Sequence, residues 1–568
     1  MEQTIAKAYQ DFIWRGELSS LATNLYDTPV ILLGGIKERV SKVLQEYRRT
    51  SWHTSEKKKA VQDALIASNK RLGSLTPQVQ GTIESLFGAA IEAAHQPVAM
   101  GGPGYILNKA ATAHRVAALS SDDNLHFGAF FFVADYDVVQ TELTNIRTPN
   151  MGHQGNLISI PVPEGYEFSP VSTLPLPSYD WYSQTEESIR SSYNPIFKVL
   201  TGQSRVVVEE RLEQALSINR WAFTCSSTLS EWAMRVLGRL FNIEGSLGLP
   251  LLPASDSSFR KLFVEAFEYL LSKDKRDHFL AAHNTSTNTI IESGMRPAIG
   301  LRDDSYVPFF YECSEASCNR ARIELSYEAD GGSAKLSGKC PSCGEVVEIE
   351  TSVNEPSLKE YGEFLSPRVD SRQFAVDTLF PVVTHVGGGG ETAYYAQVIP
   401  AAKAMGTPFP LFVKYPRVYF NTAWNEDLAG VLKEKGMTTL HRPELFKTTG
   451  RIGRFRKKER FDEMNEAIKE FHEMLVGSHG ALRIELDSIA EQLKVDTNED
   501  LQFTRLEMER YISWAFGEYA EEKMGQEVSW SWIEWALNSG FSDLFGPYER
   551  AYVPEMKNGA TLFVNFTI

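Results

Sequence analysis

Four consecutive glycines constrain the fold of this chain more than any other stretch. Gly387 to Gly390 follow an apolar, valine-rich run over residues 380–386, and Glu391 then opens an apolar pattern of helical length. This order predicts a strand, a tight loop and a helix, in which glycines permit positive φ angles and bring bare backbone close to a ligand. The first amides of such a helix can bind an anion. A flexible turn between two core elements explains the loop equally well, because it matches neither common phosphate-binding glycine motif.

Length, charge and hydropathy indicate a globular protein of several units. The chain has 568 residues and a hydrophobic content of 43%, which predicts roughly three or four structural units. A net charge of −16 argues against non-specific binding to nucleic acid or to an anionic membrane surface. The start has an acid at position 2 and lacks the apolar block of a signal peptide, and no apolar run approaches about 20 residues. We therefore expect a cytoplasmic protein.

Four of the five cysteines form two close pairs. Four residues separate Cys313 from Cys318, two separate Cys340 from Cys343, and a strand-like segment with a Gly-Gly turn lies between the pairs. This spacing predicts a zinc ribbon with a structural zinc ion, which would fold a module too small to bury its own core. A redox role for the second pair would leave the first unexplained. The fifth cysteine, Cys225, has apolar neighbours and is expected to be a small buried residue.

Polar residues follow two predicted strands of the first half. Phe127 to Val133 is predicted to form a buried strand that leads into Asp135 and Asp137, and His95 with Gln96 would end an earlier strand. Because the carboxyl ends of parallel strands form the ligand crevice of an open α/β sheet, these residues are expected to meet. A loop histidine and a polar turn are the simpler explanations of each pair taken alone.

Basic residues surround the glycine loop in sequence. The cations are expected to suit a phosphate or carboxylate ligand, and they are Arg368, Arg372, Lys414 and Arg417. The last two fall where a further strand is predicted to end.

The C-terminal part has a different pattern. Apolar residues from Phe461 to Leu493 recur every three or four positions beside dense charge, which predicts a coiled-coil hairpin or helical arm bent near Gly477 and Gly480. Leu501 to Met524 would form the returning helix. The tryptophans after residue 526 are expected to pack back on the core.

With these segments in order, the chain resembles the bacillithiol-biosynthesis cysteine-adding enzymes. The family's His-Gln-Pro segment, which leads through Gly-Pro into a Lys-containing helix, corresponds to AHQPVAMGGPGYILNK and matches at His95, Gln96, Pro97, Gly102, Pro103, Tyr105 and Lys109. The family's acidic motif E-D-H-D becomes Ala134 to Asp137, which keeps both aspartates but loses the glutamate and the histidine.

Three later motifs carry the same resemblance. The family's S-P-N-x-x-x-R corresponds to Ser366 to Arg372, and its P-R strand end to Pro416 and Arg417. Its G-G-P-G-E-x-A-Y-F-A-Q corresponds to Gly387 to Gln397, with Gly389 in place of proline and with Glu391, Tyr394 and Gln397 retained. The resemblance covers most of residues 85–568, weakly over 150–300, and the zinc ribbon is an addition.

This resemblance implies an α/β fold with a Rossmann-like parallel-sheet core and a ligase that joins cysteine to an amino-sugar conjugate, with ATP or another nucleotide as co-substrate. The implied catalytic residues are His95, Gln96, Asp135, Asp137 and Glu391. The implied substrate- or nucleotide-binding residues are Lys109, Arg372, Gly387, Gly388, Gly389, Gly390, Tyr394, Gln397 and Arg417. The altered acidic motif changes the place where a substrate amine or a metal would be held.

The predicted organisation has six segments. They are a helical region (1–88), the first part of the core (89–305), the zinc ribbon (306–352), the second part of the core with the glycine loop (353–450), the coiled-coil arm (451–525) and a C-terminal return (526–568). The arm could support a homodimer. A different hypothesis is a non-catalytic nucleotide- or metabolite-binding scaffold that uses the ribbon and the arm for protein contacts.

Overall fold

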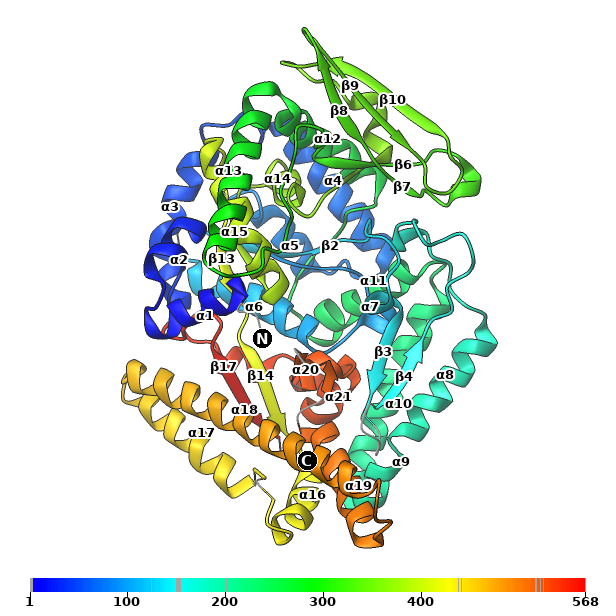
Figure 1. Ribbon diagram of the computed structural model, residues 1–568, viewed down its shortest axis with the longest axis vertical. Helices are drawn as coiled ribbons and strands as arrows, with labels where there is room; N and C mark the ends of the chain where they lie inside the picture. Colours follow the sequence, from blue (N-terminus) through cyan, green and yellow to red (C-terminus); the bar gives the residue numbers. More distant parts are fainter. Residues whose placement is uncertain are drawn as a thin grey trace.

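A five-stranded parallel sheet forms the centre of the molecule (Figure 1). The computed structural model describes residues 4–123, 125–149, 155–200, 202–437, 439–440, 442–515, 518–520, 523–524, 526–566 and 568. The strand order is β13-β12-β1-β2-β5, with β1 (Ala90–His95), β2 (Gly128–Val133), β5 (Leu251–Pro253), β12 (Val382–Gly387) and β13 (Leu411–Lys414). From β1 the chain first builds β2 and β5 on one side and later β12 and β13 on the other. This reversal next to β1 places the expected ligand crevice between β1 and β12.

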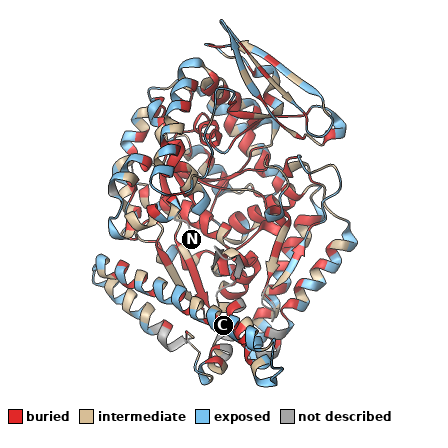
Figure 2. Cartoon of the chain, in the orientation of Figure 1, coloured by how far each residue is buried: buried red, intermediate tan, exposed pale blue. Residues whose placement is uncertain are grey.

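Alternate side chains of the strands enter two hydrophobic cores, one on each face of the sheet. Ile91 and Phe131 contribute to one core, whereas Ala90 and Phe130 contribute to the other, as the two-residue period of a strand requires. Figure 2 shows the buried residues concentrated in the sheet and the helices around it. The first face is covered mainly by α3 (Ile36–Tyr47), α6 (Tyr105–Ser120), α10 (Gly202–Thr224), α11 (Leu229–Arg239) and α21 (Trp532–Ser539). The second is covered by α4 (Ser55–Leu72), α5 (Pro77–Ser85), α12 (Ser257–Leu271), α13 (Lys273–Glu292), α14 (Arg372–Asp377) and α15 (Gly389–Ala404).

The N-terminal region is mainly helical from Ile5 onward, while residues 1–3 lie outside the described part. Helices α1 (Ile5–Arg15) and α2 (Ser19–Tyr26) pack against α15. The middle of the chain adds α7 (Thr141–Thr144), the hairpin of β3 (Asn145–Thr148) and β4 (Asn156–Ser159), α8 (Tyr179–Ser192) and α9 (Asn194–Val199).

The prediction that Cys225 is buried was wrong, because this residue directly follows the last turn of α10 and is exposed.

The cysteine-containing insert forms two small antiparallel sheets that project from one end of the core (Figure 1). The outer sheet has the order β10-β9-β8 and the inner one β11-β6-β7. Their strands are β6 (Phe309–Glu312), β7 (Arg322–Glu324), β8 (Ser326–Asp330), β9 (Ser333–Lys339), β10 (Val346–Ser352) and β11 (Leu365–Pro367). Since β11 already belongs to the returning core segment, the inner sheet ties the ribbon to the core.

A strand was predicted to end over Lys414, Pro416 and Arg417; its end at Lys414 is confirmed, but its extension to Arg417 was wrong. Strand β13 ends at Lys414, and Arg417 instead begins β14 (Arg417–Asn421), which pairs in parallel with β17 (Thr561–Asn565). Pro416 lies between the two strands and has no amide hydrogen for a sheet hydrogen bond. The chain therefore leaves the central sheet at this point and carries Arg417 into a second layer.

The C-terminal helical region contains α17 (Arg442–Lys457), α18 (Phe461–Gln492) and α19 (Glu499–Ala515), and α16 (Ala423–Glu434) precedes it within the segment predicted as core. Helix α18 continues through Gly477 and Gly480. The returning helix was predicted to reach Met524, but it ends at Ala515, and β15 (Glu518–Ala520) pairs with β16 (Lys523–Met524). Positions 516–517 and 521–522 of that stretch lie outside the described residues.

The C-terminal segment packs on the core. It contains α20 (Gln526–Ser529), α21 and α22 (Gly546–Ala551), and Trp530, Trp532 and Trp535 are all buried. The Trp532 indole donates a hydrogen bond of 2.7 Å to the Met100 carbonyl oxygen. None of the helices in the described ranges is both long and apolar enough to cross a membrane.

Candidate functional site

A cavity of about 400 Å³ lies where β1 and β12 end. His95 is the last residue of β1, the glycine loop follows β12, and the two strands are neighbours in the sheet. Helix α6 and the start of β14 supply further walls. The polar residues and loop glycines that line the cavity are His95, Gln96, Tyr105, Lys109, Glu142, Asn145, Arg147, Gly388, Gly389, Gly390, Glu391, Tyr415, Arg417 and Ser529.

The glycine loop works through close packing. None of its four glycines has a positive φ, so the loop does not use the conformational freedom that glycine permits. A Cβ on Gly387 would lie 2.6 Å from the Phe412 ring, whereas one on Gly389 or Gly390 would meet no atom within 4 Å. The first glycine therefore lets strand and helix approach each other, and the later two expose backbone to the cavity. Helix α15 begins at Gly389, and its first amides suit an anion.

Lys109 and Glu391 form an ion pair in the wall of the cavity. Lys109 also donates to the Ala94 carbonyl oxygen at 3.0 Å, and Glu391 Oε2 accepts from the Gly388 amide at 3.0 Å. Burial disfavours the charged carboxylate, but the charge and hydrogen bond of Lys109 outweigh this effect and lower the pKa of Glu391 to about 2. Glu391 therefore stays ionised and fixes the start of α15 relative to α6.

The His95 ring has a defined tautomer when it is neutral. Its Nδ1 lies 2.8 Å from the Gln96 carbonyl oxygen, and its Nε2 lies 2.6 Å from the Tyr105 hydroxyl. Because a carbonyl oxygen can only accept, Nδ1 carries the hydrogen and Nε2 accepts from Tyr105. Tyr105 is in turn stacked on Tyr415 at 6.3 Å between ring centroids. The imidazole is thus held at both nitrogens beside the glycine loop.

The two aspartates after β2 have different surroundings. Asp135 is buried and accepts from the Ser255 amide at 2.7 Å and from the Ser230 hydroxyl at 3.2 Å. Burial raises its pKa, although the Ser255 hydrogen bonds oppose this. Asp137 accepts from Gln96 Nε2 at 2.7 Å and from Arg322 at 3.3 Å. Neither aspartate lines the cavity: Asp137 contacts the lining residue Gln96, whereas Asp135 connects β2 to the segment before α12.

Three other predicted site residues are engaged away from the cavity. Arg372 is buried in an ion pair with Glu92 and donates to the Tyr395 hydroxyl at 2.9 Å. Gln397 donates to Thr287 Oγ1 at 2.6 Å and to the Ile299 carbonyl oxygen at 2.8 Å. Tyr394 lies beside Tyr395, with 5.1 Å between ring centroids, and does not line the cavity. These three side chains hold the helices behind the site.

The four cations expected around the glycine loop are dispersed. Arg368 pairs with Glu324 at 2.7 Å, and Lys414 donates to the Gln10 side chain at 3.0 Å. Of the four, Arg417 alone lines the cavity. Its guanidinium donates to the Tyr419 hydroxyl at 3.4 Å, and no carboxylate in the described ranges lies within ion-pair distance of it.

Some cavity residues were not predicted from the sequence. Tyr415 lies directly before Pro416 and Arg417, so the local pattern could have indicated it. Arg147 lies on β3 and Ser529 on α20. Both come from segments without a recognisable motif, and only the tertiary fold brings them to the cavity.

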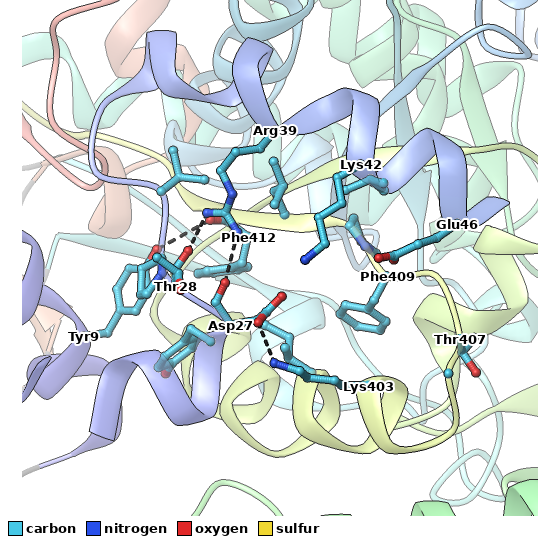
Figure 3. Close-up of a pocket in the computed structure, with 18 of the residues that line it drawn as sticks. Tyr9, Asp27, Thr28, Arg39, Lys42, Glu46, Lys403, Thr407, Phe409 and Phe412 are labelled. Carbon is cyan, nitrogen blue, oxygen red and sulfur yellow. Dashed lines mark hydrogen bonds and ion pairs between the residues drawn. The ribbon is translucent and has the colours of Figure 1, made fainter. Parts of the chain in front are cut away.

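A second cavity of about 230 Å³ lies near the start of β13, between α15 and the N-terminal helices (Figure 3). Three of its six charged residues, Asp27, Arg39 and Lys403, are engaged within the chain, and Lys42, Glu46 and Arg49 also line it. Arg39 donates to the carbonyl oxygens of Asp27, at 2.9 Å, and Thr28. Lys403 pairs with the Asp27 carboxylate at 2.7 Å. An anionic ligand would have to compete with these contacts.

The four paired cysteines form a candidate metal centre. The sulfur atoms of Cys313, Cys318, Cys340 and Cys343 lie within 4.8 Å of one another. The Cys313–Cys343 and Cys318–Cys340 sulfur pairs are each 3.9 Å apart. Sulfur atoms about 2.3 Å from a tetrahedral zinc ion are ~3.8 Å apart, so the four thiols fit such an ion.

The sequence matches the family described as bacillithiol biosynthesis BshC, N-terminal Rossmann-like domain, over residues 35–418. A protein of Cytophaga hutchinsonii named as a candidate cysteine ligase, BshC, is 24% identical over 221 residues, which is 37% of each chain. A protein of the same name from Lysinibacillus sphaericus is 26% identical over 196 residues, 34% of this chain and 32% of the relative. The matches to these curated relatives therefore span about a third of the relatives' length.

Proposed function

Because this chain belongs to the BshC family of bacillithiol biosynthesis, we propose that it is a cytoplasmic ligase that joins cysteine to the amine of an amino-sugar conjugate, with consumption of a nucleoside triphosphate. The observation that carries this proposal is the cavity between β1 and β12. There, His95, the N-terminus of α15 and Arg417 border one space. An anionic nucleotide suits this combination of backbone amides and a cation.

Amide formation from a carboxylate requires that one carboxylate oxygen leaves. In the proposed reaction, a cysteine carboxylate oxygen attacks a phosphorus atom of the nucleoside triphosphate and forms a mixed anhydride, while the P–O bond to the leaving pyrophosphate or nucleoside diphosphate breaks. The amine nitrogen then attacks the carbonyl carbon, the C–N bond forms as the C–O bond breaks, and the amine loses a proton. Arg417 and the amides of Gly389 and Gly390 would stabilise the phosphate charge. His95 would contact the reacting phosphate, and Asp137 would hold the incoming amine or accept its proton.

We further propose that the four cysteines bind zinc in a structural role. Four thiolates fill the tetrahedral coordination of the ion and leave no position for a substrate. Few residues of the outer ribbon sheet are buried. The apolar core of this sheet is therefore small, and a bound metal would supply much of the ribbon's stability. One zinc ion per chain, measured by atomic emission and lost in a Cys340→Ser variant, is the expected result.

Product analysis tests the ligase proposal. The protein is incubated with ATP, cysteine and an amino-sugar conjugate, and the cysteinyl amide is measured by mass spectrometry. His95→Ala should abolish product formation without a large change in melting temperature, whereas Lys42→Ala on α3 in the second cavity should not affect it. Absence of product from the wild-type protein, or a wild-type rate for His95→Ala, would contradict the proposal.

One observation favours a second candidate, a non-catalytic nucleotide- or metabolite-binding scaffold. The acidic motif has lost two side chains, and Asp135 is fully engaged with Ser230 and Ser255. Calorimetric binding of ATP without any product would support the scaffold.

We also propose that the helical region α17–α19 forms a homodimer contact, since Ile484 on α18 is 73% exposed. Light scattering of the full chain would measure this.

A further inference from the structure

A chain of polar contacts joins the zinc ribbon to the candidate active site. Arg322, on β7 of the ribbon, donates to Asp137 Oδ1 at 3.3 Å. The other carboxylate oxygen, Oδ2, accepts from Gln96 Nε2 at 2.7 Å. Gln96 directly follows His95, and the backbone carbonyl oxygen of Gln96 accepts the Nδ1 hydrogen of the His95 ring. Two side-chain contacts, Arg322 with Asp137 and Asp137 with Gln96, thus connect the ribbon to Gln96, the residue that sets the His95 tautomer.

The cysteine knuckle fixes the position of Arg322. The Cys313 amide donates to the Ala321 carbonyl oxygen at 2.9 Å, and the Ala321 amide donates to the Cys318 carbonyl oxygen at 2.9 Å. These bonds close the loop directly before Arg322. A metal ion that holds Cys313 and Cys318 would therefore also hold the start of β7.

The Arg322 side chain is restrained along its length. It is 8% exposed, and its guanidinium lies 4.1 Å from the centre of the Phe310 ring. It also donates to the Pro367 carbonyl oxygen at 3.1 Å, next to the segment that returns to the core. A buried arginine with a planar, fixed set of donors orients its carboxylate partner, because few other conformations keep these contacts.

We propose that Arg322 is a positioning residue through which the metal-loaded ribbon sets the orientation of Gln96 and His95. The ribbon would then control the order of the candidate active site as well as its own fold. Arg322 acts through Asp137 and contacts no substrate. This inference rests on the placement of His95 in the proposed active site, but the contact chain can be tested without any ligase assay.

The chemical reactivity of His95 reports directly on this contact. Diethyl pyrocarbonate reacts with an unprotonated ring nitrogen, and His95 Nε2 accepts a hydrogen bond from Tyr105. Loss of the contact between the Gln96 side chain and Asp137 should loosen the backbone of residues 95–96, weaken the hydrogen bond at Nδ1 and increase the rate of modification. The rate is measured at one pH by peptide mass spectrometry, on the full chain with its metal and after removal of the metal by a chelator.

We expect Arg322→Ala to raise the His95 rate about three- to tenfold, the range typical of coupled neighbours, with the metal content unchanged. Arg322→Lys, which keeps the charge, should restore part of the protection. Metal removal should raise the rate in the wild-type protein and add nothing in Arg322→Ala. Lys335→Ala is the matched control, because this ribbon residue pairs with Glu348 on the exposed outer sheet; its rate should equal that of the wild type.

An unchanged His95 rate in Arg322→Ala would overturn the proposal. Equal effects of metal removal in the wild-type and Arg322→Ala proteins would also overturn it. If Arg322→Ala fails to fold, Asp137→Asn takes its place, because it removes the ion pair with little change in volume. Failure of the ligase assay with a positive reactivity result would reject the proposed function and leave the positioning role intact.

Discussion

Two cavities lie at opposite ends of β13, and they differ in what their charged groups already bind. Near the start of the strand, Arg39 is bound to backbone carbonyl oxygens and Lys403 to Asp27. Beyond its end, Arg417 faces a cavity without a carboxylate partner in the described ranges, beside the first amides of α15. A count of cations would not distinguish the two places. For Arg39, Lys403 and Arg417, the difference shows that a cation can contribute to a ligand site only if the fold leaves its charge available.

The largest effect is expected from the ion pair that builds the cavity beyond β13. Lys109→Ala should lower the free energy of unfolding by about 3–5 kcal/mol, because Glu391 would remain in a largely buried position without its partner. Lys109 and Glu391 are only 2% and 17% exposed. Urea unfolding measures the change, with the exposed Lys42→Ala as a control near zero. A loss below about 1 kcal/mol would show that the pair does not hold the cavity together.

The same pair should make stability depend on pH. The pKa of Glu391 falls from 4.5 to about 2 on folding, so the folded state binds fewer protons than the unfolded state between these values. Its contribution, on the order of 3 kcal/mol, is present above pH 4.5 and is lost as pH falls toward 2. The double variant Lys109→Met with Glu391→Gln should lose less stability over this window. An identical pH profile for both proteins would contradict the assignment.

A smaller effect is expected in the second cavity. Arg39→Ala removes the hydrogen bonds to Asp27 and Thr28, two residues with φ angles of 47° and 63°. It should cost about 1 kcal/mol of stability and leave nucleotide binding unchanged. Thermal unfolding together with calorimetry would show this. Weaker ATP binding in this variant would mean that the second cavity also holds a ligand.

Local pattern predicted the elements well and their contacts less well. The strand before Asp135, the strand before the glycines and the spacing of the cysteines were all visible in the sequence, because periodicity and metal-ligand spacing are local properties. Asp135 and Asp137 looked equivalent at this level. Only the folded chain brings Ser230 and Ser255 onto one of them and Gln96 onto the other. Arg372 likewise matched a family motif, yet its partner Glu92 lies 280 positions earlier.

The route by which Arg417 reaches the cavity could not be predicted, for a related reason. Its strand belongs to a separate pair with β17, formed almost 150 residues later. Sequence placed it beside the glycine loop along the chain, and the structure agrees that it lines the same cavity. The strand that carries Arg417 is not the predicted one, because Pro416 ends the pairing with the central sheet and β14 pairs with β17 instead.

Calorimetric titration of ATP into the wild-type protein and the variants Arg417→Ala and Arg39→Ala tests the difference between the two cavities most directly. We predict binding to the wild type and to Arg39→Ala with equal affinity, and at least about tenfold weaker binding to Arg417→Ala, the loss expected for one charge-assisted contact. Unfolding curves should show that Arg417→Ala remains folded. Unchanged affinity in Arg417→Ala, with a loss in Arg39→Ala, would place the nucleotide in the other cavity and contradict the assignment.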